Sequence, residues 1–267
     1  MKAAIIGGGN IGLALAQGLV RAGVSQPAAI TITRRNTAAL SAAAVLGFRT
    51  TTNNMLAIEG AEAIFVCVLP QQLDEALQQL KAAIDLEKQL VVSVVTGAHS
   101  SVFKKALGNN LRIIRAMPNT AMKVGESMTC IAAVNATGAD VKMVQDLFDT
   151  MGQTIVINEE MMSAATALCA CGIAFFLRTI RAASQGGVEI GFHAPDALRI
   201  AVQTAFGAAK LLITNKTHPE EEIDKVTSPK GCTIAGLNEM EHQGLSSAMI
   251  KGIRLSSAIA NNLYKES

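Results

Sequence analysis

The chain has 267 residues, 50% of them hydrophobic and only 16% charged, so it can bury a large core and is not disordered. Its net charge is +2 and its basic residues are scattered, which argues against a nucleic-acid partner or an anionic membrane surface. The chain contains no Trp and one Tyr, so it also lacks the stacking platforms of a protein that binds single-stranded nucleic acid.

Neither a metal site nor a membrane span is expected. The five cysteines include no C-x-x-C pair, which predicts reduced thiols rather than a zinc site or a disulfide framework. The beginning of the sequence has no secretory pattern, so we expect a cytoplasmic location. The most apolar stretch, residues 164–177, is interrupted by Gly172 and is too short to cross a bilayer, which predicts a buried helix.

The first half of the chain alternates short β-branched runs with Ala-rich amphipathic segments. The runs predict strands at residues 3–6, 29–33, 63–68, 89–94, 112–115, 128–134 and 154–157. The segments predict helices at residues 11–22, 37–46, 71–84 and 140–151. Such alternation, with strands apolar on both faces, is typical of an α/β fold with a Rossmann-type, doubly wound parallel sheet.

Strand signals stop after residue 158, and an all-helical domain is expected from there. Helices are predicted at residues 159–190, 195–214 and 231–264. We therefore divide the chain into an N-terminal domain, residues 1–158, and a helical domain, residues 159–267. The first of these helices is apolar on nearly every face and must be buried on every face. It is either a central helix or, as we prefer, a subunit interface of a homodimer or a higher oligomer.

A glycine-rich loop follows the first predicted strand directly. It reads Gly7-Gly8-Gly9-Asn10-Ile11-Gly12 and runs into a predicted helix. In such loops the first glycine makes the tight turn, the second lets a pyrophosphate approach the backbone, and the third lets helix and strand pack closely. The helix N-terminus then faces the phosphates. This context predicts a dinucleotide site at Gly7, Gly9, Asn10, Ile11 and Gly12, and the alternative is an ordinary glycine-rich turn.

The end of the second predicted strand indicates which dinucleotide binds. NAD-binding proteins usually place an acidic residue about 20 residues past the loop. Here that position holds Thr33, followed by Arg34 and Arg35. Two guanidinium groups suit a 2′-phosphate, so the sequence predicts NADP(H). In the alternative, one arginine stacks on the adenine and the other is solvated.

A loop in the last sixth of the chain is the second candidate site. Ser228-Pro229 forms a turn, Gly231 relieves backbone crowding, and Thr233 is placed to cap a helix over residues 234–243. Free backbone amides at a helix start bind carboxylates. The Thr233 hydroxyl is then free to meet a second polar atom of a ligand. The alternative is a capped helix start without a ligand.

Four segments, in their order along the chain, carry a family resemblance. They are Cys67-Val68-Leu69-Pro70, Ser93-Val94-Val95-Thr96-Gly97-Ala98, Arg115-Ala116-Met117-Pro118-Asn119-Thr120 and Val226-Thr227-Ser228-Pro229-Lys230-Gly231-Cys232-Thr233. Over essentially its whole length the chain resembles the Δ1-pyrroline-5-carboxylate reductase family, which catalyses the last step of proline biosynthesis. The resemblance implies an NADPH-dependent reduction of a cyclic imino acid, L-1-pyrroline-5-carboxylate, to L-proline.

The resemblance also implies roles for individual residues. Ser228, Gly231 and Cys232 would hold the substrate carboxylate, and Thr233 would orient the imine nitrogen as the catalytic residue. Glu159 would contact the substrate amine, although an acid favoured by the dipole of a helix start is an equal alternative. The cofactor would be contacted by Asn54 at the adenosine, Cys67, Val68, Leu69 and Pro70 along the ribose and pyrophosphate, Thr96 at the nicotinamide, and Asn119.

The chain departs from the family pattern at several positions. Cys169-Ala170-Cys171-Gly172-Ile173-Ala174-Phe175 replaces S-G-S-G-P-A-Y, Leu69 replaces a lysine and Ala121 a proline, and Lys230 and Cys232 stand where Gly and Thr or Ala are commoner. A divergent member that reduces another cyclic imine therefore stays open. Two further alternatives are a β-hydroxyacid dehydrogenase-like enzyme, which needs a lysine that the long helix lacks, and a non-catalytic NADP(H) sensor.

Overall fold

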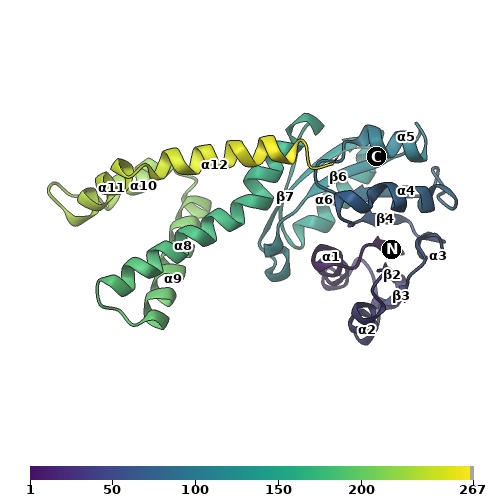
Figure 1. Ribbon diagram of the computed structural model, residues 1–267, viewed down its shortest axis with the longest axis horizontal. Helices are drawn as coiled ribbons and strands as arrows, with labels where there is room; N and C mark the ends of the chain where they lie inside the picture. Colours follow the sequence, from purple (N-terminus) through teal and green to yellow (C-terminus); the bar gives the residue numbers. More distant parts are fainter. Residues whose placement is uncertain (265–267) are drawn as a thin grey trace. The chain divides into compact units, whose positions relative to one another are not determined.

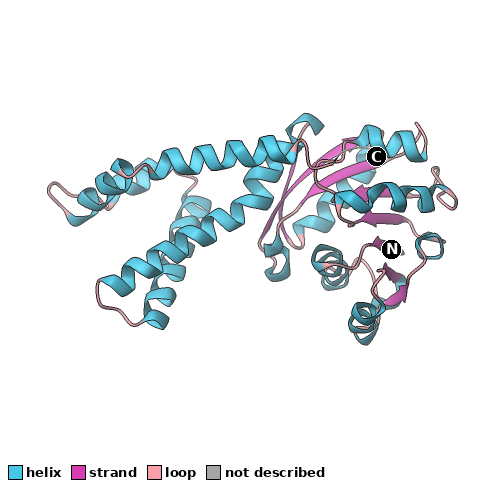
Figure 2. Ribbon diagram, in the orientation of Figure 1, coloured by secondary structure: helices cyan, strands magenta, loops and turns pink. Residues whose placement is uncertain are grey.

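A computed structural model describes residues 1–264 of the chain. Within these residues an eight-stranded sheet forms the N-terminal part, drawn in magenta in Figure 2 (see also Figure 1). The strands are β1 (Ala3–Ile6), β2 (Ile30–Thr33), β3 (Arg49–Thr51), β4 (Ala63–Val66), β5 (Leu90–Ser93), β6 (Ile113–Met117), β7 (Ser127–Val134) and β8 (Gly152–Val156). Their spatial order is β3-β2-β1-β4-β5-β6-β7-β8. Because β1 lies between β2 and β4, the predicted doubly wound fold is confirmed.

One pair of strands departs from the predicted parallel sheet. β6 and β7 are antiparallel, whereas the other neighbouring pairs are parallel. The connection between them holds only a 3₁₀ turn, η3 (Thr120–Val124). A parallel connection needs a crossover of about a dozen residues or more, usually with a helix, so this short segment can only reverse the chain.

Helices pack on both faces of the sheet. They are α1 (Asn10–Arg21), α2 (Thr37–Val45), α3 (Asn54–Ile58), α4 (Leu73–Lys81), α5 (Ser100–Leu107) and α6 (Gly138–Asp149). Alternate residues of the central strands β1, β4, β5 and β6 enter two separate apolar clusters. Ile5 belongs to the cluster of Leu15 in α1 and Phe148 in α6, whereas Ile6 belongs to the cluster of Phe103 in α5. This two-sided burial explains why the strands read as continuous apolar runs.

Three elements of this part have weak sequence signals and were not predicted. β3 has only three residues, all of them polar, and α3 has only five. The side chain of Asn53 caps α3 by accepting hydrogen bonds from the backbone amides of Met55 and Leu56. α5 begins at Ser100, directly after the turn that follows β5. These short segments are held by their packing on the sheet rather than by helix or strand propensity.

The chain divides into two compact units, and their boundary differs from the predicted one at residue 158. The first unit runs from Met1 to Cys171 and includes residues 255–264, and the second is Gly172–Arg254. The segments η4 (Glu159–Met161), α7 (Met162–Ala165) and a π-helix (Thr166–Cys171) belong to the first unit. Met162 and Ala165 share a buried cluster with Met117 of β6 and Cys130 of β7, which ties these residues to the sheet.

The end of the chain returns to the first unit. The Ser163 hydroxyl donates a hydrogen bond to Asn261 at 2.6 Å, and the Tyr264 hydroxyl donates one to Asp74 of α4 at 2.5 Å. The backbone of Ala260 also lies against Gly97, where an added Cβ would come within 3.0 Å of its carbonyl oxygen. Residues 159–171 and 255–264 of the predicted helical domain therefore pack with the sheet unit.

The second unit is helical, as predicted. It contains α8 (Gly172–Glu189), α9 (Ala194–Asn215), α10 (Pro219–Lys225), α11 (Cys232–His242) and the first part of α12 (Leu245–Ala260). α8 and α9 approach closely, because a Cβ added at Gly187 would lie 3.0 Å from the Cβ of Ala197. The single helix predicted over residues 231–264 is two helices, since Gly244 has a φ of +81° and ends the first one.

Large apolar side chains are exposed along the helices of the second unit. Phe176 on α8 is 62% exposed, Phe206 on α9 is 60% exposed and Ile250 on α12 is 58% exposed. Two helical stretches, Glu159–Glu189 and Ala194–Asn215, are long and apolar enough to cross a membrane by length and composition alone, with 28% and 6% of their apolar windows buried within the chain. Large apolar side chains exposed on several helices are typical of an interaction surface.

Candidate functional site

The glycine loop joins β1 to α1 and has the geometry of a dinucleotide turn. Gly7 has a φ of +103°, and a Cβ there would lie 2.8 Å from the carbonyl oxygen of Cys67. A Cβ at Gly12 would overlap the carbonyl oxygen of Gly7 and press on Ile5, so only glycine lets α1 pack against β1. At Gly9, by contrast, an added Cβ would meet no atom of residues 1–264 within 4 Å. The open space there is where the pyrophosphate of a dinucleotide can approach the backbone.

The first turn of α1 offers unpaired donors beside that space. Gly9 is the N-cap residue of α1, and no side chain caps the helix. Within residues 1–264 the backbone amides of Asn10 and Ile11 donate no hydrogen bond to the protein. Such amides, together with the positive end of the helix dipole, suit a phosphate group. The loop therefore fits the predicted cofactor.

These residues line a cleft of about 650 Å³ at the carboxyl ends of β1, β2 and β4. Eleven of the predicted cofactor residues form its wall: Gly7, Gly9, Asn10, Ile11, Thr33, Arg34, Arg35, Asn54, Cys67, Val68 and Leu69. Seven residues of the wall were not predicted: Gly8, Asn36, Thr52, Gln72, Glu75, Ala76 and Gln79. Four predicted residues do not line it: Gly12, Pro70, Thr96 and Asn119. Gly12 lies in α1 and leaves room for the Gly7 carbonyl oxygen of the loop. Pro70 begins the 3₁₀ turn η2 (Pro70–Gln72), whose last residue lines the cleft.

Two guanidinium groups stand at the end of the cleft next to β2. Arg34 donates a hydrogen bond from Nη1 to the carbonyl oxygen of Gly8 at 3.2 Å, which holds it over the loop. Arg35 pairs with Glu75 across 3.7 Å, and both side chains are more than half exposed. An exposed ion pair of this length contributes little stability, so Arg35 is free to turn to a phosphate. This arrangement fits the 2′-phosphate of NADP(H).

The far wall of the cleft is built by α3 and α4. Asn54 donates from Nδ2 to Oε1 of Gln79 at 2.8 Å, and Gln79 donates to Glu75 at 3.5 Å. Glu75 and Gln79 are one helical turn apart and therefore face the cleft together. On the floor, burial raises the pKa of the Cys67 thiol, which stays neutral.

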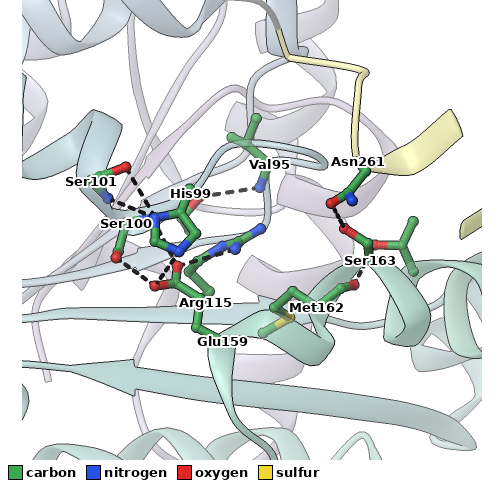
Figure 3. A network of polar contacts seen from close by, with 11 residues as sticks. Val95, His99, Ser100, Ser101, Arg115, Glu159, Met162, Ser163 and Asn261 are labelled. Atoms are coloured by element: carbon green, nitrogen blue, oxygen red, sulfur yellow. Dashed lines mark hydrogen bonds and ion pairs between the residues drawn. The ribbon is translucent and has the colours of Figure 1, made fainter. Parts of the chain in front are cut away.

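Asn119 and Glu159 have structural partners that the sequence did not reveal. The Asn119 side chain accepts a hydrogen bond from the Ala121 amide and donates one to the Cys169 carbonyl oxygen, so it holds the loop after β6. Figure 3 shows Glu159 in a polar network with Ser100, Arg115 and His99. The contact between Glu159 and the substrate amine that the resemblance implied stays a prediction, and in this structure both oxygens of the carboxylate have protein partners.

The network around Glu159 neutralises a buried guanidinium. Oε1 accepts from the Ser100 amide at 2.8 Å and from Arg115 at 3.1 Å, and Oε2 accepts from the Ser100 hydroxyl at 2.6 Å. The Arg115 side chain is only 7% exposed. Burial alone would raise the pKa of Glu159, but the hydrogen bonds from Ser100 and the charges of Arg115 and His99 outweigh it and lower that pKa. The carboxylate is thus a counterion inside the protein.

Replacing Glu159 with Gln is expected to destabilise the first unit by about 3 kcal/mol, because Arg115 keeps its buried charge without a counterion. Since the folded-state pKa of Glu159 lies below its ordinary value of 4.5, its stabilisation is present above that value and is lost as the pH falls through the folded-state pKa. Urea unfolding at pH 7 and in this acid range measures both effects. Glu160→Gln, at an exposed neighbour, is the control. Equal stability losses in the two variants would contradict this role.

The second candidate site lies in the helical unit and differs in one detail from the prediction. α11 begins at Cys232 with Gly231 as its N-cap residue, so Thr233 is the second residue of the helix and not its cap. The Gly231 amide donates to the Ser228 carbonyl oxygen at 3.0 Å and closes the turn, which removes it from the donors predicted for a ligand. A Cβ at Gly231 would press on the Ser228 hydroxyl and lie 3.0 Å from the Ser228 carbonyl oxygen, so the tight turn favours glycine there.

What remains at the start of α11 is a set of free donors. No side chain caps this helix. Within residues 1–264 the backbone amides of Cys232 and Thr233 have no protein acceptor, and the Thr233 hydroxyl makes no hydrogen bond. Lys230, in the turn before the helix, has a φ of +59°, which explains why glycine is the commoner residue there. A carboxylate fits these two amides, with the hydroxyl left for a neighbouring atom of the ligand.

The fold and the cleft together define the class of protein. A doubly wound sheet carries the glycine loop and the arginine pair, and a helical unit carries a second helix start with free backbone amides. This combination is that of an NADP-dependent oxidoreductase with a helical second domain.

Comparison with known proteins gives the family. Residues 159–263 match the family model described as pyrroline-5-carboxylate reductase dimerisation, and residues 2–97 match that described as NADP oxidoreductase coenzyme F420-dependent. Pyrroline-5-carboxylate reductase 2 of Dictyostelium discoideum is 43% identical over 269 residues, covering 95% of this chain and 90% of that protein. The chain belongs to the pyrroline-5-carboxylate reductase family.

Two further similarities frame this assignment. Pyrroline-5-carboxylate reductase 1 of Dictyostelium discoideum is 48% identical over 275 residues and covers 98% of this chain, but the chain spans about half, 50%, of that relative's length. The crystal structure of Plasmodium falciparum pyrroline carboxylate reductase with NADP bound has a TM-score of 0.88 at 22% identity and covers 99% of this chain and 98% of that chain. This second similarity shows the common fold.

Proposed function

We propose that this chain catalyses the NADPH-dependent reduction of L-1-pyrroline-5-carboxylate to L-proline. The observation that carries the proposal is that the chain contains two helix starts with free amides: one beside Arg34 and Arg35, and one beside the unbonded Thr233 hydroxyl. The first suits a dinucleotide phosphate and the second suits a small carboxylate. Family membership supplies the reaction that joins the two ligands, and the NADP bound to the Plasmodium relative supports the choice of cofactor.

In this mechanism the protein contributes orientation and charge. NADPH, when bound, supplies the hydride that reduces the C=N carbon. The amides of Cys232 and Thr233 hold the substrate carboxylate, and the Thr233 hydroxyl orients the imine nitrogen. Because that nitrogen is basic and arrives protonated, the product amine forms without a strong general acid in the protein. Thr96, after β5, is proposed to lie at the nicotinamide end of the cofactor.

Replacing Thr233 with Ala is expected to lower turnover and substrate affinity together, by about 10-fold each, since one hydrogen bond to a charged group is lost. The affinity for NADPH stays unchanged, because Thr233 is not in the wall of the cleft. Thr233→Ser keeps the hydroxyl and should restore most of the activity. Steady-state kinetics together with an NADPH titration measure these effects. Unchanged turnover in the alanine variant would remove Thr233 from the mechanism.

We further propose that the chain works as a homodimer through its helical unit, with a higher oligomer as the alternative. The exposed apolar side chains on α8, α9 and α12 support this, as does the dimerisation model matched by residues 159–263. We also propose a cytoplasmic location, in line with five free cysteines within residues 1–264. Analytical ultracentrifugation tests the assembly.

The experiment that tests the function is to follow NADPH oxidation with pyrroline-5-carboxylate as the substrate. Parallel assays replace NADPH with NADH, and the substrate with the six-membered homologue piperideine carboxylate. The proposal predicts the highest kcat/KM for NADPH with the five-membered imine. A preference for the six-membered ring would indicate another cyclic-imine reductase, and turnover with neither imine would refute the proposal.

A further inference from the structure

Two cysteines from distant parts of the sequence meet on the sheet. Cys130 lies in β7 and Cys169 lies in the π-helix that precedes α8. Their sulfur atoms are 3.3 Å apart, and both thiols are free. A disulfide bond is about 2.05 Å long, so the sulfurs need to approach by only about 1.2 Å. The pair therefore stands close to bonding geometry in the reduced protein.

The surroundings of the pair hold the two sulfurs together. Cys130 is 6% exposed and belongs to the buried cluster of Met117, Met162 and Ala165, while Cys169 packs on the edge of that cluster and is partly exposed. The Cys169 backbone is fixed as well, because its carbonyl oxygen accepts a hydrogen bond from the Asn119 side chain at 3.3 Å. A small oxidant can thus reach Cys169, whereas Cys130 is covered.

The contact also shifts the pKa values of the two thiols in opposite directions. A hydrogen bond from the Cys130 thiol lowers the pKa of Cys169 to about 7, although burial opposes the shift. The same hydrogen bond raises the pKa of Cys130, and burial adds to it. The thiolate is the reactive form of cysteine, so the partly exposed Cys169 is the nucleophile and the buried Cys130 is the resolving cysteine.

We propose that Cys130 and Cys169 form an oxidation site for hydrogen peroxide, in which the peroxide reacts at Cys169 and Cys130 closes the disulfide. The Cys169 thiolate attacks one peroxide oxygen, the O–O bond breaks, and the leaving hydroxide takes up a proton to become water. This leaves a sulfenic acid on Cys169. The Cys130 sulfur then attacks the Cys169 sulfur, its proton goes to the departing hydroxide, and a second water leaves. In sum, two thiols are oxidised and one peroxide is reduced to two waters.

The disulfide bond would cross-link two elements of the first unit. It would tie the π-helix to β7. The π-helix ends at Cys171, immediately before Gly172, where the helical unit begins. The bond would also immobilise the carbonyl oxygen that holds the Asn119 loop. The cross-link closes a loop of 39 residues, which reduces the freedom of the unfolded chain. We therefore expect oxidised protein to unfold several degrees higher and to exchange its amide hydrogens more slowly at residues 166–171.

The test uses the whole chain, freed of reductant and treated with hydrogen peroxide in slight excess. The protein is then blocked with an alkylating agent, digested with trypsin and analysed by mass spectrometry. The expected product is peptide 124–142, which contains Cys130, joined to peptide 143–178, which contains Cys169 and Cys171. Dithiothreitol should release both peptides. If peroxide modifies the protein but leaves peptide 124–142 unlinked, the proposal is wrong.

Matched variants assign the bond to the correct sulfur. Cys171→Ser, in the same π-helix, should still form the linked peptide, whereas Cys169→Ser should not. Cys130→Ala places another small apolar side chain in the buried cluster. In this variant peroxide oxidation of Cys169 should stop at the sulfenic acid, which dimedone traps. Activity is not the readout, because Cys232 lies in the candidate substrate loop and its oxidation could itself affect turnover. A link that survives Cys169→Ser would overturn the assignment.

Discussion

Replacing Gly12 with Ala is expected to abolish NADPH binding and to destabilise the first unit, whereas Gly9→Ala is expected to weaken NADPH binding alone. The added Cβ at Gly12 would overlap the Gly7 carbonyl oxygen, so α1 must move away from β1. Overpacking of this kind costs about 1–3 kcal/mol, and the move also displaces the loop. At Gly9 the new methyl group enters open space that the pyrophosphate needs, at a φ of −80° that alanine accepts.

The two glycine variants differ in their expected thermal stability. Thermal unfolding should give a lower midpoint for Gly12→Ala and the wild-type midpoint for Gly9→Ala. Fluorescence titration with NADPH should show at least a 10-fold rise in Kd for Gly9→Ala, because a pyrophosphate kept from the backbone loses at least one charge-assisted hydrogen bond. Wild-type affinity in Gly9→Ala would place the cofactor somewhere other than this cleft.

Replacing Arg34 and Arg35 together with Ala should raise the KM for NADPH about 100-fold and leave the KM for NADH nearly unchanged. Each guanidinium supplies charge-assisted hydrogen bonds to a 2′-phosphate, worth about 1.5–3 kcal/mol, and NADH has no such group. The measurement is kcat and KM for both cofactors at fixed substrate. The cofactor preference of the enzyme should then fall or reverse.

Two further variants sharpen this experiment. Arg49→Ala removes an exposed arginine of β3 that does not line the cleft, and it should change neither KM. Glu75→Gln removes the carboxylate that competes for Arg35, and it should lower the KM for NADPH slightly. Equal effects of the double arginine variant on NADPH and NADH would contradict the assignment of the 2′-phosphate site.

The cofactor half of the site could be predicted because local sequence and sheet geometry agree there. The glycine loop and Cys67 each follow a buried parallel strand and Thr33 ends another, and the carboxyl ends of parallel strands meet at one edge of the sheet. Residues contributed by a helix face were missed. Glu75 and Gln79 line the cleft only because of the way α4 packs on the sheet, which the sequence of α4 alone does not reveal.

The partners of Glu159 and Asn119 could not be predicted, because they depend on tertiary contacts between segments far apart in the chain. Glu159 meets Ser100 across 59 residues and Arg115 across 44. The start of α11 was misplaced by two residues, since the cap is a glycine and the expected threonine lies inside the helix. Helix ends are the least certain feature of such predictions, because several polar residues in succession can serve as the cap.

The most direct test of the central claim is to follow the hydride itself. NADPH deuterated at C4 of the nicotinamide is incubated with the protein and pyrroline-5-carboxylate, and the product is analysed by mass spectrometry and proton NMR. The account predicts L-proline with one deuterium at C5, and the Gly9→Ala variant should form it far more slowly. Oxidation of NADPH without deuterated proline would contradict the account.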